Sequence, residues 1–92
     1  MAHYVPNYMQ INNYEAIQLD EEWIILNTDD FTMTKLNAVG GFCWSILEQN
    51  QTLPSLVQAV HENYVAVSET IEKDLQEFLF ELIQCGLIKY AT

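Results

Sequence analysis

The fold of this chain is decided by the stretch Leu36-Asn37-Ala38-Val39-Gly40-Gly41-Phe42-Cys43-Trp44-Ser45-Ile46-Leu47. Asn37 is a good helix N-cap, and apolar side chains then recur with helical spacing at Val39, Phe42, Cys43, Ile46 and Leu47. We predict a helix over residues 38–49 that begins directly after a strand. Gly40 and Gly41 each lower its helix propensity by roughly 1 kcal/mol relative to alanine, so we expect them to permit close approach of another element.

Two further helices are predicted downstream. Thr52 is expected to cap the first of them, with Pro54 tolerated in its first turn and an apolar face made of Leu53, Leu56, Val57, Val60 and Tyr64. Ser68 is expected to cap the second, which has a buried stripe made of Ile71, Leu75, Phe78, Leu79 and Leu82. Gly86 fits the left-handed position after a helix, and residues 87–90 read as a short extended tail.

The first half of the chain predicts a small antiparallel meander. Residues 14–19 alternate in a way that suits a half-buried strand, residues 23–26 have the β-branched and aromatic composition of a central strand, and residues 31–36 read as a third strand. The third strand has a single neighbour in such a meander. One side of its backbone is therefore left unpaired unless something covers it.

Length and composition indicate a single domain. Ninety-two residues, half of them hydrophobic, support one core, and we divide the chain into an arm over residues 1–13 and a domain over residues 14–92. The longest apolar runs are far shorter than a membrane span, and the N-terminus lacks a basic region followed by an apolar segment. We expect a soluble, cytoplasmic protein with no membrane partner.

The charge of the chain is strongly acidic. Thirteen carboxylates stand against three lysines and no arginine, which gives a formal net charge of −10. Such a surface repels phosphate and attracts cationic or neutral partners. The negative charge could serve either of two roles: it could keep a small protein in solution, or it could steer a partner toward the surface.

No catalytic or metal-binding constellation is apparent. His61 has only His3 as a second imidazole, with no cysteine or aspartate at ligand spacing. Cys43 lies in an apolar helix stripe, where burial raises the pKa of a thiol, and Cys85 is likewise expected to be an unpaired thiol of a reducing compartment. We predict no enzyme activity, no metal and no cofactor.

The fold class that these elements predict is α+β, a winged helix-turn-helix with a three-stranded antiparallel sheet followed by three helices. Such folds often bind DNA through a recognition helix. Here the third helix would carry Glu69, Glu72, Asp74, Glu77 and Glu81 against the single Lys73. This helix would be repelled by phosphate, so we expect no nucleic-acid partner.

An exposed strand edge beside a helix offers a different mode of recognition, in which an extended peptide adds to the sheet as a further strand. Phe80 supports this mode, because it lies opposite the buried stripe of the third helix. The alternative is that this helix is buried on two sides, by the sheet and by the N-terminal arm.

The chain resembles a known family at several points in order: Leu36-Asn37 leading into a helix of small residues, Trp44, Thr52, Tyr64, Asp74, and Leu82 followed by Gly86-Leu87-Ile88. These residues look like the PqqD-like fold, the peptide-recognition element of pathways that modify ribosomally made peptides. The resemblance covers about residues 14–90. The pattern over residues 23–36 is most similar to stand-alone members of lasso-peptide pathways.

The resemblance implies a winged helix that binds the leader part of a precursor peptide, paired with the third strand and lying beside the third helix. By position, the pairing strand is Phe31, Thr32, Met33, Thr34 and Lys35. The helix wall comes from Glu72, Gln76, Leu79, Phe80 and Ile83.

The function that follows is a non-catalytic adaptor that captures a leader peptide and presents it to a separate leader peptidase, and possibly to a cyclase. Two alternatives stay open: an acidic winged-helix regulator that binds a basic protein, and a chaperone of quinone-cofactor biosynthesis.

Overall fold

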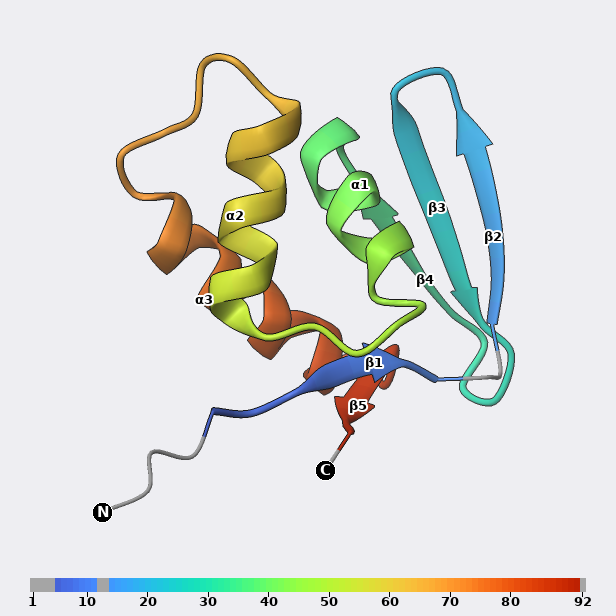
Figure 1. Ribbon diagram of the computed structural model, residues 1–92. Helices are drawn as coiled ribbons and strands as arrows, with labels where there is room; N and C mark the ends of the chain where they lie inside the picture. The colour runs from blue at the N-terminus through green and yellow to red at the C-terminus, as the bar shows by residue number, and fades with distance from the viewer. Residues whose placement is uncertain (1–4, 12–13, 92) are drawn as a thin grey trace.

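A computed structural model describes residues 5–11 and 14–91. Five strands and three helices follow one another along these residues (Figure 1). In chain order they are β1 (Tyr8–Gln10), β2 (Tyr14–Leu19), β3 (Glu22–Asn27), β4 (Thr32–Leu36), α1 (Ala38–Ile46), α2 (Leu53–Asn63), α3 (Ile71–Gln84) and β5 (Ile88–Tyr90).

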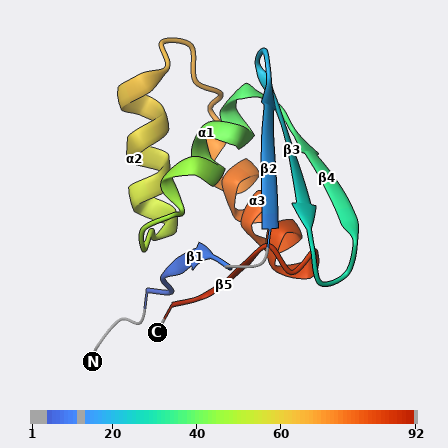
Figure 2. The same cartoon turned by 90° about the vertical axis from the view of Figure 1, so that its right-hand side faces the viewer.

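The central sheet has the order β2-β3-β4, and both of its strand pairs are antiparallel. It is followed by three helices, which all lie to one side of the sheet (Figures 1 and 2). The predicted fold class, a three-stranded antiparallel meander followed by three helices, is confirmed.

A second, two-stranded sheet joins the two ends of the chain. Strand β1 pairs antiparallel with β5, and Tyr8 lies opposite Tyr90. Backbone bonds also tie β1 to the turn after α1, because the N–H of Gln10 donates to the carbonyl of Leu47 at 2.8 Å. The extended tail predicted over residues 87–90 is confirmed as β5, whereas the sequence did not predict β1.

Two of the three predicted helix caps are confirmed. The Asn37 side chain accepts the N–H of Gly40 at 2.8 Å, and Thr52 forms a reciprocal capping box with Ser55. The cap predicted at Ser68 is wrong, since the Ser68 hydroxyl instead accepts the N–H of Thr70, and α3 begins after Thr70. The predicted caps are therefore correct for the two helices in which the cap side chain accepts the N–H of the residue three positions later.

Helix α1 is shorter than predicted and ends at Ile46 rather than at residue 49. The side chain of Gln51 donates to the carbonyl of Ile46 at 3.0 Å, and the side chain of Gln10 donates to the carbonyl of Trp44 at 2.6 Å. These donors occupy carbonyls that a longer helix would use. Gln10, which is distant in the sequence, and Gln51, which is near, thus help to end the helix.

The end of α3 is fixed by Gly86 and Asn27. Gly86 adopts a left-handed φ of 71°, and the N–H of Leu87 donates back to the carbonyl of Leu82 at 2.9 Å, which confirms the predicted glycine cap. The buried Asn27 side chain donates to the carbonyls of Cys85 and Gly86. Its oxygen accepts the N–H groups of Asp29 and Asp30. Asn27 therefore joins the β3–β4 turn to the end of α3.

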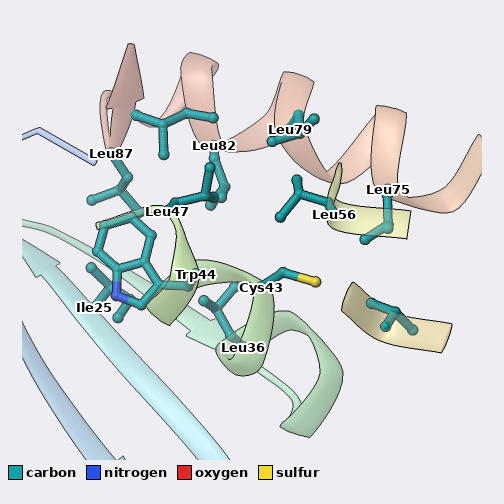
Figure 3. Packing of buried hydrophobic residues seen from close by; sticks show 12 residues of the cluster. Ile25, Leu36, Cys43, Trp44, Leu47, Leu56, Leu75, Leu79, Leu82 and Leu87 are labelled. Carbon is teal, nitrogen blue, oxygen red and sulfur yellow. The ribbon is translucent and has the colours of Figure 1, made fainter. Parts of the chain in front are cut away.

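The core lies between the sheet and the helices (Figure 3). Trp44 of α1 is its largest buried side chain, and it lies among Ile25 of β3, Leu47 and Leu87. A Cβ atom at Gly41 would overlap the indole of Trp23, which confirms that this glycine permits close approach of another element. Both predicted free thiols are confirmed.

Two details of the predicted meander are wrong. Phe31 lies outside β4, in the turn before it, with a positive φ of 56° and a side chain that is 82% exposed. Strand β2 is not half-buried, because residues 15–19 are all exposed. At the start of β2 the ring of Tyr14 packs against Trp44 of α1, with 5.0 Å between the ring centroids, but α1 contacts mainly β3 and β4.

Candidate functional site

Strand β4 is an open edge of the central sheet. Within the residues that the structure describes, β3 is the only strand that pairs with it. Strands β2 and β3 are joined by the two-residue turn Asp20-Glu21, and the pair that closes such a turn exchanges both backbone hydrogen bonds. Since hydrogen-bonded pairs alternate along an antiparallel ladder, the backbone groups of Met33 and Lys35 point to the open side of β4.

A groove begins where β4 ends. It has a volume of about 320 Å³ and lies between the start of α1 and the first half of α3. Its lining is mainly apolar, with a polar group at each side, and consists of Asn37, Val39, Gly40, Ile71, Asp74, Leu75 and Phe78. A Cβ atom at Gly40 would lie 3.4 Å from the ring of Phe78 and 3.5 Å from Leu36, so the missing side chain keeps this end of the groove open.

The flank of α3 that faces this groove differs from the predicted wall. Asp74 and Phe78 lie one helical turn apart and both line the groove, whereas none of the five predicted wall residues does. Leu79 is only 2% exposed in the core, and Ile83 packs against the core. Helical periodicity places Glu72, Gln76 and Ile83 on another flank, because successive residues turn by about 100°.

Phe80 is exposed, as predicted, with 62% of its surface accessible. Together with Gln76 it lines a second hollow of about 500 Å³ on the outer surface of α3, which also includes Lys73, Glu77 and Glu81. All five residues come from a single helix, so this hollow is not shared with β4. Exposed Glu72 lines neither of the two hollows.

The sequence did not predict that Val39, Gly40, Asp74 and Phe78 line one groove. A signal for Asp74 and Phe78 was present, because their four-residue spacing puts them side by side on a helix. The sequence could not show which neighbouring element this flank of α3 faces. The direction of this flank follows from the side of α3 that is buried in the core, which carries Leu75, Leu79 and Leu82.

Polar side chains at the site bond to neighbours within the chain. Asp74 accepts a hydrogen bond from the Thr70 hydroxyl at 3.0 Å, and Lys35 on β4 forms an ion pair with Glu22 at 3.0 Å.

Burial raises the pKa of the Cys43 thiol to about 11, as predicted, so this cysteine is a poor nucleophile at neutral pH. In residues 5–11 and 14–91, no group of three His, Cys, Asp or Glu side chains could hold a metal ion. The same residues contain no helix long and apolar enough to cross a membrane.

An open strand edge next to a helix-lined apolar groove defines the class of protein, a winged-helix domain able to accept an extended segment by strand addition. The chain belongs to the PqqD family, described as coenzyme PQQ synthesis protein D, whose match covers residues 22–88. This confirms the predicted resemblance.

The chain is also similar to a solved structure described as "TbiB1 in Complex with the TbiA(beta) Leader Peptide". The TM-score is 0.75 at 28% sequence identity, and the match covers 88% of this chain and 94% of the other. A comparison with curated proteins gives no match.

Proposed function

We propose that this chain is a non-catalytic adaptor that binds the leader part of a precursor peptide and presents it to a separate leader peptidase, and in lasso-peptide biosynthesis also to a cyclase. The observation that carries the proposal is the similarity, over nearly the whole of both chains, to TbiB1 bound to a leader peptide. The open edge of β4 and the groove beside it supply a place for such a peptide.

The leader would extend the sheet along β4. Its backbone would bond to the groups of Met33 and Lys35 that point to the open side, within the pairing segment Thr32–Lys35. An apolar leader side chain would enter the groove against Phe78 and Val39. Four main-chain bonds at roughly 0.5 to 1.5 kcal/mol each give several kcal/mol before ordering costs.

The strand-addition step is tested by proline substitution on both edges of one sheet. Met33→Pro removes a backbone donor from the open side of β4, and Gln18→Pro removes the equivalent donor from the open side of β2. We expect Met33→Pro to weaken binding of a labelled leader peptide at least tenfold in fluorescence anisotropy. Gln18→Pro should change the affinity less than twofold. Equal affinities for two folded variants would contradict pairing at β4.

The groove is tested by two phenylalanines of the same helix. Phe78 lines the groove and Phe80 lies on the outer surface of α3. Phe78→Ala should lower leader affinity by roughly 5- to 150-fold, the usual range for an anchor pocket, and Phe80→Ala should change it little. Because Phe78 is half-buried, Val39→Ser serves as a milder variant, and thermal melting checks that each variant is folded. A larger loss for Phe80→Ala would move the anchor site to the outer hollow.

The adaptor itself should leave its peptide chemically unchanged. Mass spectrometry of a leader-bearing peptide incubated with this chain alone should show the intact mass, and cleavage should appear after a leader peptidase is added. Cys43→Ala should not affect this result, because the thiol is buried and protonated. A product formed by the chain alone would show that it is an enzyme.

A second candidate function is that of a chaperone in quinone-cofactor biosynthesis, which the name of the family favours. The two candidates differ in the peptide that is bound. Anisotropy with a quinone-cofactor precursor and with a lasso-type leader therefore separates them.

A further inference from the structure

The outer face of the central sheet carries a stripe of apolar side chains, flanked by Glu15, Glu22 and Lys35, and none of the helices that the structure describes covers it. The strand register places Ile17 opposite Ile24, and Leu26 opposite Met33. Because side chains alternate between faces, five apolar residues share the outer face: Ile17, Leu19, Ile24, Leu26 and Met33. Ile17 is 54% exposed, Leu19 52% and Met33 72%.

This set is distinct from the core. Ile25, Leu36 and Trp23 belong to the opposite face, which packs against α1, whereas Ile24 and Leu26 do not join the core cluster. The helices lie on one side of the sheet (Figure 2), and Ile25 is buried on that side (Figure 3). The outer face is therefore a separate apolar surface, and it lies on the opposite side of the sheet from the groove beside α3.

The alternation along β2 is the reverse of the usual one. A two-faced antiparallel sheet normally directs its apolar side chains to the core and its polar ones to water. In β2, Ala16 and Gln18 share the face of Ile25, while Ile17 and Leu19 lie on the exposed face. Contiguous exposed apolar surface of this kind marks an interaction site.

The charge around this face indicates the kind of partner that could bind to it. Residues 14–36, which form the sheet and its turns, carry six carboxylates and one lysine. That lysine, Lys35, is paired with Glu22 at 3.0 Å. A second copy of the chain would bring two acidic surfaces together, which costs free energy, whereas a protein with an apolar centre and a basic rim would be complementary.

We infer that the outer face, centred on Ile17, Leu19 and Ile24, docks a protein partner that has an apolar patch rimmed by lysine and arginine. The inference rests on the proposed function, in which this partner is the enzyme that processes the leader-bound precursor. The leader occupies the β4 edge and the groove, and the enzyme covers the outer face. Both are therefore bound at the same time.

The test uses the full chain, a labelled leader peptide that it binds, and a purified leader peptidase that cleaves the precursor with that leader. The double variant Ile17→Thr/Leu19→Thr removes apolar surface and keeps strand propensity. Val65→Thr is the control, because Val65 is fully exposed in the loop after α2. Glu15→Lys changes a charge on the outer face, and Glu62→Lys makes the same change on α2.

We expect the double variant to weaken peptidase binding at least tenfold in calorimetry, while its leader affinity stays within twofold of wild type. Glu15→Lys should weaken peptidase binding more than Glu62→Lys does, and the difference should shrink at high salt.

Unchanged peptidase binding by the double variant, with normal leader binding, overturns the inference alone. Absence of leader binding by the wild-type chain overturns the proposed function, and the inference with it. A wild-type dimer that the double variant dissociates in sedimentation assigns the face to a second copy and also overturns the inference.

Discussion

The two faces of the β2-β3-β4 sheet have similar residue types and different environments. Ile24 and Ile25 are neighbours in β3, yet Ile25 is fully buried against the helices while Ile24 lies on the uncovered face. Both faces carry large aliphatic side chains. Their difference separates the hydrophobic residues that stabilise the fold from those that we infer to bind a partner.

The two faces of the sheet are also expected to differ in how much their residues contribute to stability and to binding. Substitutions on the inner face should reduce the free energy of unfolding, since they leave cavities in a packed core. Substitutions on the outer face should affect stability less, because these side chains keep more of their surface exposed after folding. The four predictions below test this separation in order of expected effect.

The largest difference is expected between Ile25→Ala and Ile24→Ala. Ile25 is 0% exposed, so its truncation should lower the free energy of unfolding by roughly 2 to 5 kcal/mol. Ile24 is half-buried, and its truncation should cost about 1 kcal/mol or less. Urea denaturation of both variants measures the difference. Equal losses would mean that the outer face contributes to the core.

A pH-dependent loss of stability is expected from Cys43, which lies beneath the inner face. Burial raises its pKa from 9.0 to about 11, so between these values the unfolded chain releases a proton that the folded chain retains. Stability from this group is complete below pH 9 and falls as pH rises to 11, by at most about 2.7 kcal/mol. Denaturation at pH 8 and 10.5, compared with Cys43→Ala, isolates the contribution. An identical pH dependence in both proteins would contradict it.

Two adjacent glycines of α1 provide the third test. Gly41→Ala forces a methyl group into the indole of Trp23, and overpacking of this kind costs roughly 1 to 3 kcal/mol. Gly40→Ala meets its neighbours at 3.2 to 3.5 Å and gains helix propensity, so its effect should be near zero. Thermal melting should rank Gly41→Ala clearly below Gly40→Ala. The reverse ranking would show that Trp23 moves aside readily.

The smallest effect is expected on the outer face. Ile17→Thr keeps a β-branched side chain at a position that is 54% exposed, so the free energy of unfolding should change by less than about 0.5 kcal/mol. Chemical denaturation measures this change. A loss of several kcal/mol would show that Ile17 stabilises the isolated chain.

Local signals in the sequence were sufficient for much of the fold. The cap at Asn37, the capping box at Thr52 and the glycine at position 86 act over a few residues, so the order of strands and helices was predictable. The open edge of β4 also followed, because a meander has two edges. These features depend on backbone preferences and not on distant contacts.

Features that depend on distant contacts were not predictable. Strand β1 exists because three residues near one end of the chain pair with three near the other, and such short segments carry little periodicity. The flank of α3 beside the groove depends on how that helix packs against α1 and the sheet. The alternation of β2 was visible, yet the sequence could not show which of its faces the helices cover.

The pairing of the two chain ends has a mechanical consequence. Because β1 and β5 are antiparallel and Tyr8 lies opposite Tyr90, the flanking segments leave the domain at the same end of this ladder. A pulling force applied to both flanks would load the hydrogen bonds one after another, as in opening a zipper, instead of shearing them together. Tension on the two flanks would thus peel β1 from β5 first, while the core around Trp44 still holds the rest of the domain together.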